Sequence, residues 1–233
     1  MLVTGFPAAA FGTNCYVVAP AAGEECLVVD PGIGVLDRLG EVLREHRLRP
    51  AAVLLTHGHL DHVWSVTPVC GGSGVPALVH GDDAYRLKDP VSTLDPALVA
   101  MLEQQFGSAA RWTEPDDVRA LVDGETVAMA GLAVGVRHAP GHTEGSALFT
   151  LDDVPDGLSG AEVSSTVLSG DVLFAGSIGR TDLPGGDHAA MLRSLRDVVL
   201  PMPDDRLVLP GHGPATTIGR ERSANPYLLE VAR

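Results

Sequence analysis

The sequence predicts an α+β fold in which two mixed sheets pack face to face, with helices on the outside. Strand-like segments fall into two groups along the 233 residues, and each group is followed by segments with helical spacing of apolar residues. The chain is 45% hydrophobic, enough for a sizeable core, and its prolines and glycines do not gather into a linker. We therefore expect one domain over residues 1–233, with loop insertions near 89–117 and 152–165.

The first group of elements lies before residue 90. Segments rich in Val, Leu and Tyr predict strands at 14–18, 25–30, 51–55 and 77–79. Apolar residues at helical spacing predict a helix over 34–46, and further helices are expected over 61–70 and 82–87. Asp30-Pro31-Gly32 is typical of a turn.

The second group follows the first insertion. A hairpin is expected over 125–136, turning at Ala130-Gly131, and the alternation over 146–151 predicts another strand. Residues 189–199 place Met191, Leu192, Leu195, Val198 and Val199 on one helical face. Residues 207–209 are expected to form a last buried strand.

The run Thr56-His57-Gly58-His59-Leu60-Asp61-His62 carries the strongest functional signal. It holds four strong metal ligands directly after the apolar run 51–55. His57 and His59 are two residues apart, so in an extended chain their side chains point to the same side. Borderline cations such as zinc favour imidazole nitrogen and carboxylate oxygen. The alternative is a set of surface histidines at the start of a helix.

Three downstream motifs favour the metal site over that alternative. Each places one ligand in a turn after an apolar segment (132–136, 167–168 or 207–209), with glycine beside the ligand so that backbone can approach closely. They are Pro140-Gly141-His142-Thr143, Ser169-Gly170-Asp171-Val172 and Leu209-Pro210-Gly211-His212-Gly213-Pro214. A single Gly-His turn is more often structural, but four motifs in this order together predict a metal centre.

With these motifs the chain resembles the metallo-β-lactamase superfamily from about Asn14 to Pro226, and within it the short bacterial subgroup of the glyoxalase II-like thioester hydrolases (hydroxyacylglutathione hydrolases). The resemblance implies a four-layer αβ/βα sandwich and two divalent metal ions, zinc by default, with iron or manganese as alternatives. It implies that His57, His59 and His142 bind one ion. It assigns the other ion to Asp61, His62 and His212, with Asp171 bridging both.

The same resemblance implies an activity and its catalytic residues. A metal-bridging hydroxide would attack the carbonyl carbon of a thioester like S-lactoylglutathione, with Asp171 holding both ions and Asp61 also orienting the hydroxide. Within 176–182, Arg180 stands where glutathione-using relatives bind a substrate carboxylate through lysine. The alternative is that Arg180 pairs with Asp182 or Asp187 and stiffens its loop. Longer family members hold glutathione with a C-terminal helical domain that this chain is expected to lack. The identity of the thiol in the substrate is therefore left open.

Other activities remain as alternatives. A persulfide dioxygenase with a single iron shares the fold and a similar Gly-Arg-Thr-Asp segment, here 179–182. Another hydrolase of the fold, such as a lactonase or a β-lactamase, is a further possibility. The motif at 210–214 followed by Thr216-Thr217-Ile218-Gly219 favours the thioester hydrolase, and a non-catalytic scaffold would be expected to have lost ligands.

Charge and cysteine content limit the kinds of partner and the cellular compartment that we expect. A net charge of −14 and a pI near 4.9 disfavour nucleic acid and anionic membrane surfaces, so a small-molecule thioester is the expected partner. Cys15 and Cys26 lie in apolar strand-like runs and are expected to be buried thiols. With Cys70 they make an odd number of cysteines and imply no disulfide framework, which fits a reducing compartment. No signal-peptide pattern or long apolar run is present, so a cytoplasmic location is expected. Oligomeric state is left open.

Overall fold

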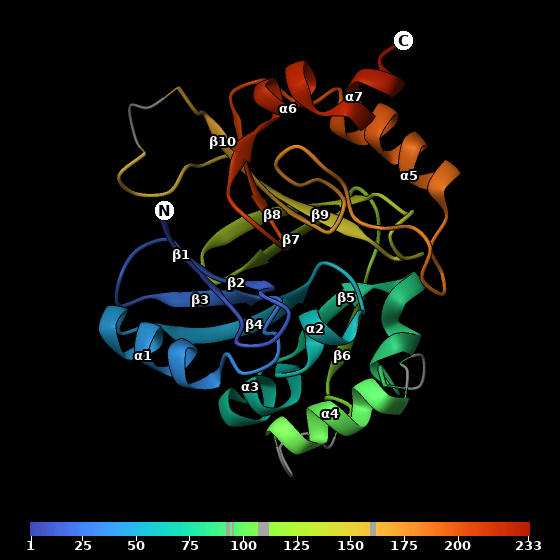
Figure 1. Ribbon diagram of the computed structural model, residues 1–233. Helices are drawn as coiled ribbons and strands as arrows, with labels where there is room; N and C mark the ends of the chain where they lie inside the picture. The colour runs from blue at the N-terminus through green and yellow to red at the C-terminus, as the bar shows by residue number, and fades with distance from the viewer. Residues whose placement is uncertain (92–93, 95, 107–111, 159–161) are drawn as a thin grey trace.

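Two six-stranded sheets pack face to face, and helices cover both outer surfaces (Figure 1). The structure is a computed structural model that describes residues 1–91, 94, 96–106, 112–158 and 162–233. The predicted α+β sandwich of two mixed sheets is confirmed. The predicted insertions at 89–117 and 152–165 lie partly outside the described residues.

The first sheet has the order β1-β2-β3-β4-β5-β6. Its first three strands pair antiparallel, and the pairs from β3 to β6 are parallel. Its elements are β1 (Leu2–Pro7), β2 (Asn14–Ala19), β3 (Glu25–Val29), α1 (Leu36–His46), β4 (Arg49–Leu55), α2 (Leu60–Val63), α3 (Val66–Ser73), β5 (Ala77–His80), the 3₁₀ helix η1 (Gly81–Leu87), α4 (Pro96–Phe106) and β6 (Val118–Leu121).

The second sheet has the order β12-β11-β10-β9-β8-β7, and only β10 and β11 pair parallel. Its elements are β7 (Thr126–Met129), β8 (Leu132–His138), β9 (Ala147–Leu151), β10 (Ser165–Gly170), α5 (His188–Ser194), the π-helical turn η3 (Leu195–Val199), β11 (Arg206–Pro210), β12 (Thr216–Thr217), α6 (Ile218–Ala224) and α7 (Pro226–Val231). The predicted hairpin turns at Ala130 and Gly131, both with positive φ.

Apolar side chains form three main packed layers. The middle layer lies between the sheets and includes Leu27 and Leu54 from the first sheet and Phe149 and Leu168 from the second. A second layer lies between the first sheet, α1 and α3, and a third between the second sheet and the helices α5 to α7. Both sheets are therefore covered on both faces. This packing fixes the position of the strand ends of one sheet relative to those of the other.

The helix predicted over 61–70 is interrupted, and this expectation was wrong. The backbone amide of Ser65 donates to the carbonyl of Pro31 at 2.9 Å, and its hydroxyl donates to the carbonyl of Gly32 at 2.7 Å. These bonds to a neighbouring loop replace the helical bond that Ser65 would otherwise make. The chain restarts as α3, with Pro68 in the first turn, where its missing N–H leaves no bond unmade.

Several elements have no counterpart among the predictions. These are β1, β6, α4 inside the 89–117 insertion, the short β12, and α6 and α7 near the end of the described chain. The segment 82–87 is helical as expected but of the 3₁₀ type, and 189–199 continues from α-helix into a π-helical turn. Cys15 and Cys26 are buried thiols, as predicted, and Cys70 is buried as well.

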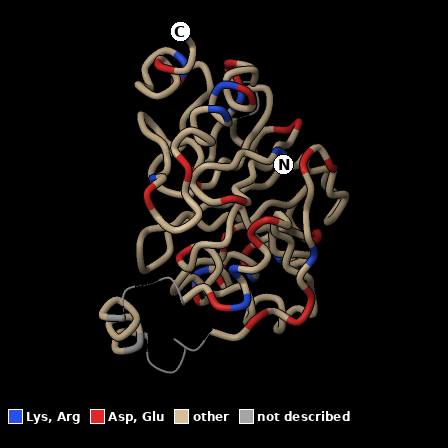
Figure 2. Tube along the Cα trace, turned by 90° about the vertical axis from the view of Figure 1, so that its right-hand side faces the viewer, with Lys and Arg blue, Asp and Glu red and all other residues tan. Residues whose placement is uncertain are grey.

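Acidic residues are spread over most of the molecule and do not gather into one patch (Figure 2). This distribution agrees with a solvated acidic surface. Among the residues described, no helix has the length and apolar character that crossing a membrane requires.

Gly141 is a position where the backbone leaves no room for a side chain. Its φ is +143°, and a Cβ there would collide with the backbone Cα and amide of the buried Met191 on α5. We predict that Gly141→Ala lowers the free energy of unfolding by about 2–4 kcal/mol, since positive φ and overpacking each cost about 1–3 kcal/mol. Urea denaturation followed by circular dichroism measures this.

Gly157→Ala is the matched control for Gly141→Ala. Gly157 also has a positive φ, +84°, but a Cβ there meets nothing within 4 Å. Gly157→Ala should lower the free energy of unfolding only by the cost of positive φ for alanine, about 1 kcal/mol. Equal losses in the two variants would show that contact with α5 does not matter.

Candidate metal centre

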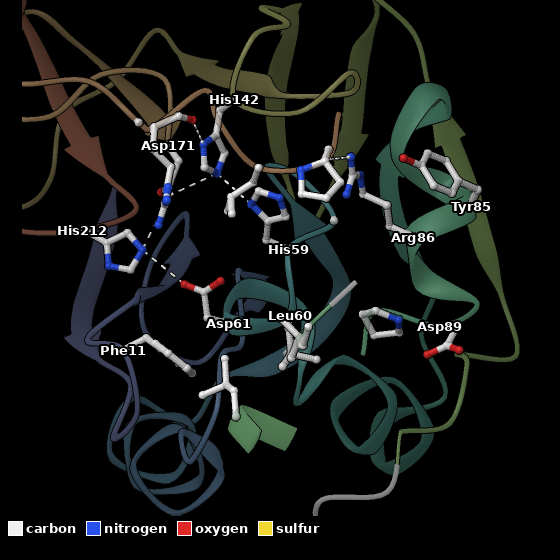
Figure 3. Close-up of a pocket in the computed structure, with 18 of the residues that line it drawn as sticks. Phe11, His59, Leu60, Asp61, Tyr85, Arg86, Asp89, His142, Asp171 and His212 are labelled. Carbon is white, nitrogen blue, oxygen red and sulfur yellow. Dashed lines mark hydrogen bonds and ion pairs between the residues drawn. The ribbon is translucent and has the colours of Figure 1, made fainter. Parts of the chain in front are cut away.

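All seven predicted ligand residues come together in one cluster, and five of them, His59, Asp61, His142, Asp171 and His212, line a cavity of about 630 Å³ (Figure 3). His57 and His59 follow β4, His142 lies in the loop from β8 to β9, and Asp171 and His212 directly follow β10 and β11. The loops that carry them leave neighbouring ends of the two sheets. Residues 155 positions apart in the sequence (212 − 57) are thereby brought into one cluster.

The first group of donors consists of three imidazoles. Nε2 of His142 lies 3.1 Å from Nε2 of His57 and 2.8 Å from Nδ1 of His59. Zinc–nitrogen bonds of about 2.0–2.1 Å in a tetrahedral site place ligand nitrogens roughly 3.3 Å apart. These three nitrogens therefore fit one metal ion after small adjustments.

The second group combines Asp61, His62 and His212. Oδ2 of Asp61 lies 3.3 Å from Nε2 of His212 and 3.6 Å from Nε2 of His62. Asp171 lies between the two groups: its Oδ2 is 3.5 Å from Nε2 of His142 and 3.5 Å from Nε2 of His212. A carboxylate in this place is within reach of both candidate ions.

Two buried polar atoms in the described chain have no hydrogen-bond partner, and they face each other. They are Nε2 of His62 and Oδ1 of Asp171, 3.3 Å apart. Nδ1 of His62 donates to Oδ2 of Asp30 at 2.9 Å, so a neutral His62 turns its Nε2 lone pair toward the carboxylate. Such a pair is unfavourable when buried unless a cation lies between the two atoms. The donor set therefore fits a metal ion.

The pKa values of the histidines follow their surroundings. Burial and the neighbouring His142 lower the pKa of His59 to about 3, and burial with His62 lowers that of His57 well below its usual value. Burial also opposes the charged form of His62, but Asp171, Asp61 and Asp30 together raise its pKa. The first group is thus neutral and ready to bind a cation, and the second group attracts positive charge.

Asp30 fixes the orientation of two candidate ligands. Besides the bond from His62, its carboxylate accepts the amide of Thr56 at 2.8 Å and the hydroxyl of Thr56 at 2.6 Å. Because that hydroxyl donates to Asp30, its oxygen is free to accept Nδ1–H of His57 at 3.1 Å. Both imidazoles then present Nε2 to the centre, as second-shell partners of metal-binding histidines generally ensure.

Asp83, on η1, connects the two histidine-bearing loops. Its fully buried carboxylate accepts the amide of Gly58 at 2.7 Å, between His57 and His59. It also accepts the hydroxyl of Thr143 at 2.7 Å and the amide of Gly145 at 2.8 Å, on the loop that carries His142. One side chain therefore sets the distance between loops that belong to different sheets.

Arg180 makes the ion pair that the alternative prediction named. Its guanidinium binds Asp182 with two bonds of 2.7 Å and is largely exposed, while its backbone carbonyl accepts Nδ1–H of His142 at 2.7 Å. Asp187, the other predicted partner, instead caps α5 through the amide of Ala190. Arg180 is also among the residues that line the cavity, so its position is compatible with both pairing and substrate contact.

A separate His80, Asp82 and His138 cluster does not match a metal site as well. The two imidazoles stack in parallel planes with centroids 3.9 Å apart, so their lone pairs do not converge on one point. Nε2 of His138 donates to the carbonyl of Glu144 at 2.8 Å, and Nδ1 of His80 accepts the amide of Asp82 at 3.3 Å. Both nitrogens already have partners.

Three supporting residues were missed from the sequence. Asp30 was assigned to a strand end and a turn but to no function, although it directly follows a buried strand beside the ligand-bearing one, which is a usable signal. Asp83 lies in a helix-like segment without a motif. Thr13, whose hydroxyl donates to Oδ2 of Asp61 at 2.8 Å, likewise carries no recognisable pattern.

The profile of the metallo-beta-lactamase superfamily matches residues 8–212. A protein of Mycobacterium tuberculosis, described as uncharacterized, is 42% identical over the full length of both chains. Two further relatives each align over 95% of both chains: the hydroxyacylglutathione hydrolase GloC of Haemophilus influenzae, 33% identical, and the probable metallo-hydrolase YqgX of Bacillus subtilis, 32% identical.

Solved structures agree with this assignment. The B3 metallo-beta-lactamase BLEG-1 superposes with a TM-score of 0.76 at 33% identity, covering 97% of this chain and 99% of that one. TTHA1623, solved in a di-iron-bound form, gives a TM-score of 0.74 at 31% identity over 97% of this chain and 100% of that one. By fold, by donor set and by sequence, the chain belongs to the metallo-beta-lactamase superfamily.

Proposed function

We propose that the chain is a metal-dependent hydrolase of small-molecule thioesters of the hydroxyacyl-thiol type. The observation that carries the proposal is the pair of three-residue donor groups at the base of one cavity, with Asp171 within reach of both. The relationship to GloC, which is named a hydroxyacylglutathione hydrolase, supports the substrate class.

The proposed metal complement is two divalent cations per chain. His57, His59 and His142 would hold one, Asp61, His62 and His212 the other, and Asp171 both. Bound divalent metal lowers the pKa of a water from 15.7 to about 7, which supplies a nucleophile at neutral pH. The nitrogen-rich donor set suits zinc, and the di-iron form of TTHA1623 keeps iron as the alternative.

The chemistry of the leaving group favours a thioester over an amide. A thiol has a pKa of about 8.5, so a thiolate departs without a dedicated acid, whereas an amine needs one. Among the described residues that line the cavity, the histidines are His59, His142 and His212, and each belongs to a donor group. Asp61, whose Oδ2 accepts the hydroxyl of Thr13, would also orient the attacking water.

The first prediction concerns metal and activity together. Protein produced in medium with added zinc or iron should contain about two metal ions per chain by elemental analysis, and it should hydrolyse S-lactoylglutathione. Chelation should abolish the activity, and added zinc or iron should restore it. One iron per chain with oxygen uptake on glutathione persulfide, and no thioester hydrolysis, would instead identify a persulfide dioxygenase.

The second prediction concerns Asp171. Asp171→Asn removes the charge proposed to hold both ions, so we expect loss of at least one metal per chain and a fall in kcat of more than about a hundredfold. Elemental analysis and steady-state kinetics on the same preparation measure the two effects. Full metal occupancy with near-normal turnover would contradict the bridging role.

The third prediction concerns Arg180 as a contact for a substrate carboxylate. Arg180→Ala should raise KM for S-lactoylglutathione by roughly two- to tenfold, because an exposed charged contact is weakened by solvent, and should change kcat less. A thioester of an uncharged thiol should be insensitive to the change.

Arg196→Ala is the matched control for Arg180→Ala. Arg196 is also exposed and pairs with a neighbouring aspartate, Asp197, at 2.8 Å, but it does not line the cavity. It should leave KM unaltered. If Arg180→Ala lowers the melting temperature while KM stays unchanged, Arg180 only stiffens its loop through Asp182.

A further inference from the structure

The cavity above the candidate metal centre has two chemically different ends. Phe11 and Leu60 lie on one side of His59 and Asp61, while Tyr85 and Arg86 lie toward the other (Figure 3). A thioester with its carbonyl at the centre extends in two directions, toward its acyl group and toward its thiol. The two ends of the cavity therefore offer different surroundings to the two halves of a bound substrate.

Phe11 is an unusual residue at the apolar end. Its side chain is 49% exposed, and its backbone adopts φ of 60°, which L-residues other than Asn and Asp rarely do. The loop is fixed by a backbone bond from Ala8 to Thr13 at 2.7 Å and by the bond from Thr13 to Asp61. A strained, exposed aromatic ring held at a cavity wall gains little from the core, and such outliers point to a ligand contact.

The rest of the apolar end is built on packed structure. Leu94 and Leu98, before and on α4, are half-buried and line the cavity. They pack on a small buried cluster of Ile33, Leu60 and Leu102, of which Leu60 also lines the cavity. This wall has its own core and so presents a fixed apolar surface beside the reacting centre.

The opposite end carries cations in a chain that is otherwise strongly acidic. Arg86 is bound to Glu144, Asp83 and the carbonyl of Pro184, and Arg180 is bound to Asp182. Lys88, which follows η1 two residues after Arg86, also lines the cavity together with its neighbour Asp89, and no ion pair joins its ammonium to another described residue. It can bind an anionic group without breaking an existing pair.

We propose that the acyl half of the substrate occupies the Phe11 end and that an anionic group of the thiol half binds at the Lys88 end. The preferred substrates are thus thioesters of apolar acyl groups, longer than lactoyl, on an anionic thiol. This inference rests on the proposed thioester hydrolysis. Water adds to the carbonyl carbon and the C–S bond breaks; the thiolate leaves with the bonding electrons and takes up a proton, which gives a carboxylic acid and a thiol.

A series of glutathione thioesters tests the assignment on the metal-loaded full-length chain. Lactoyl, acetyl, butyryl, hexanoyl and octanoyl esters are compared by kcat/KM. We expect a rise of roughly three- to fourfold for each methylene buried, until the Phe11 end is filled. Phe11→Gly removes the ring and relieves the positive φ, so it should fold normally and flatten the series.

Control variants distinguish the effects of the two ends of the cavity on substrate choice. Leu229→Ala, at an exposed leucine on α7 outside the cavity, should leave the series unchanged. Leu98→Gln, on the α4 wall, should flatten the series as Phe11→Gly does. Lys88→Gln should raise KM for every glutathione ester by a similar factor and leave the dependence on acyl length intact.

Two outcomes would overturn the assignment while the proposed function stands. One is hydrolysis of the lactoyl ester with no gain for longer acyl groups. The other is a gain with chain length in acetyl esters of alkanethiols but not along the acyl series, which would place the thiol half at the Phe11 end. Failure to hydrolyse any thioester, with metal bound, would instead reject the proposed function.

Discussion

Two buried carboxylates hold the histidine-bearing loops, and the geometry of the centre depends on them. Asp30 accepts two donors from Thr56 and one from His62, and Asp83 accepts donors from Gly58, Thr143 and Gly145. A carboxylate only accepts, so each ties several donors to one point. Asp83 does this across the two sheets. It therefore fixes the distance between the histidine side chains of the first sheet's loop and that of the second.

The same arrangement concentrates negative charge under the second donor group. Asp30, Asp61 and Asp171 all act on His62, and a buried charge without a partner is strongly destabilising. A bound dication would remove that imbalance, so the energetics of the fold and of metal binding are linked. The first donor group has no such excess of charge, and its imidazoles are kept neutral by burial.

The sequence predicted the donor residues better than the elements that support them. Ligands such as His142 and Asp171 stand in glycine-flanked turns after apolar strands, so local pattern suffices to find them. The break at Ser65 depends on carbonyls of a loop more than thirty residues earlier, which no local pattern contains. The role of Asp83 could not be predicted from the sequence either, because its partners come from segments that only the tertiary fold brings together.

The start of the described chain also reaches its last candidate ligand. Thr13 forms a bridge with His212, and the side chain of Asn14 donates to the carbonyls of Pro210 and Gly213, 196 and 199 positions away. During synthesis the second donor group therefore cannot close until residues 210–213 have left the ribosome. Until then, His57, His59 and His62 lack the ligands that come later in the sequence. The centre therefore assembles late in the folding of each new molecule.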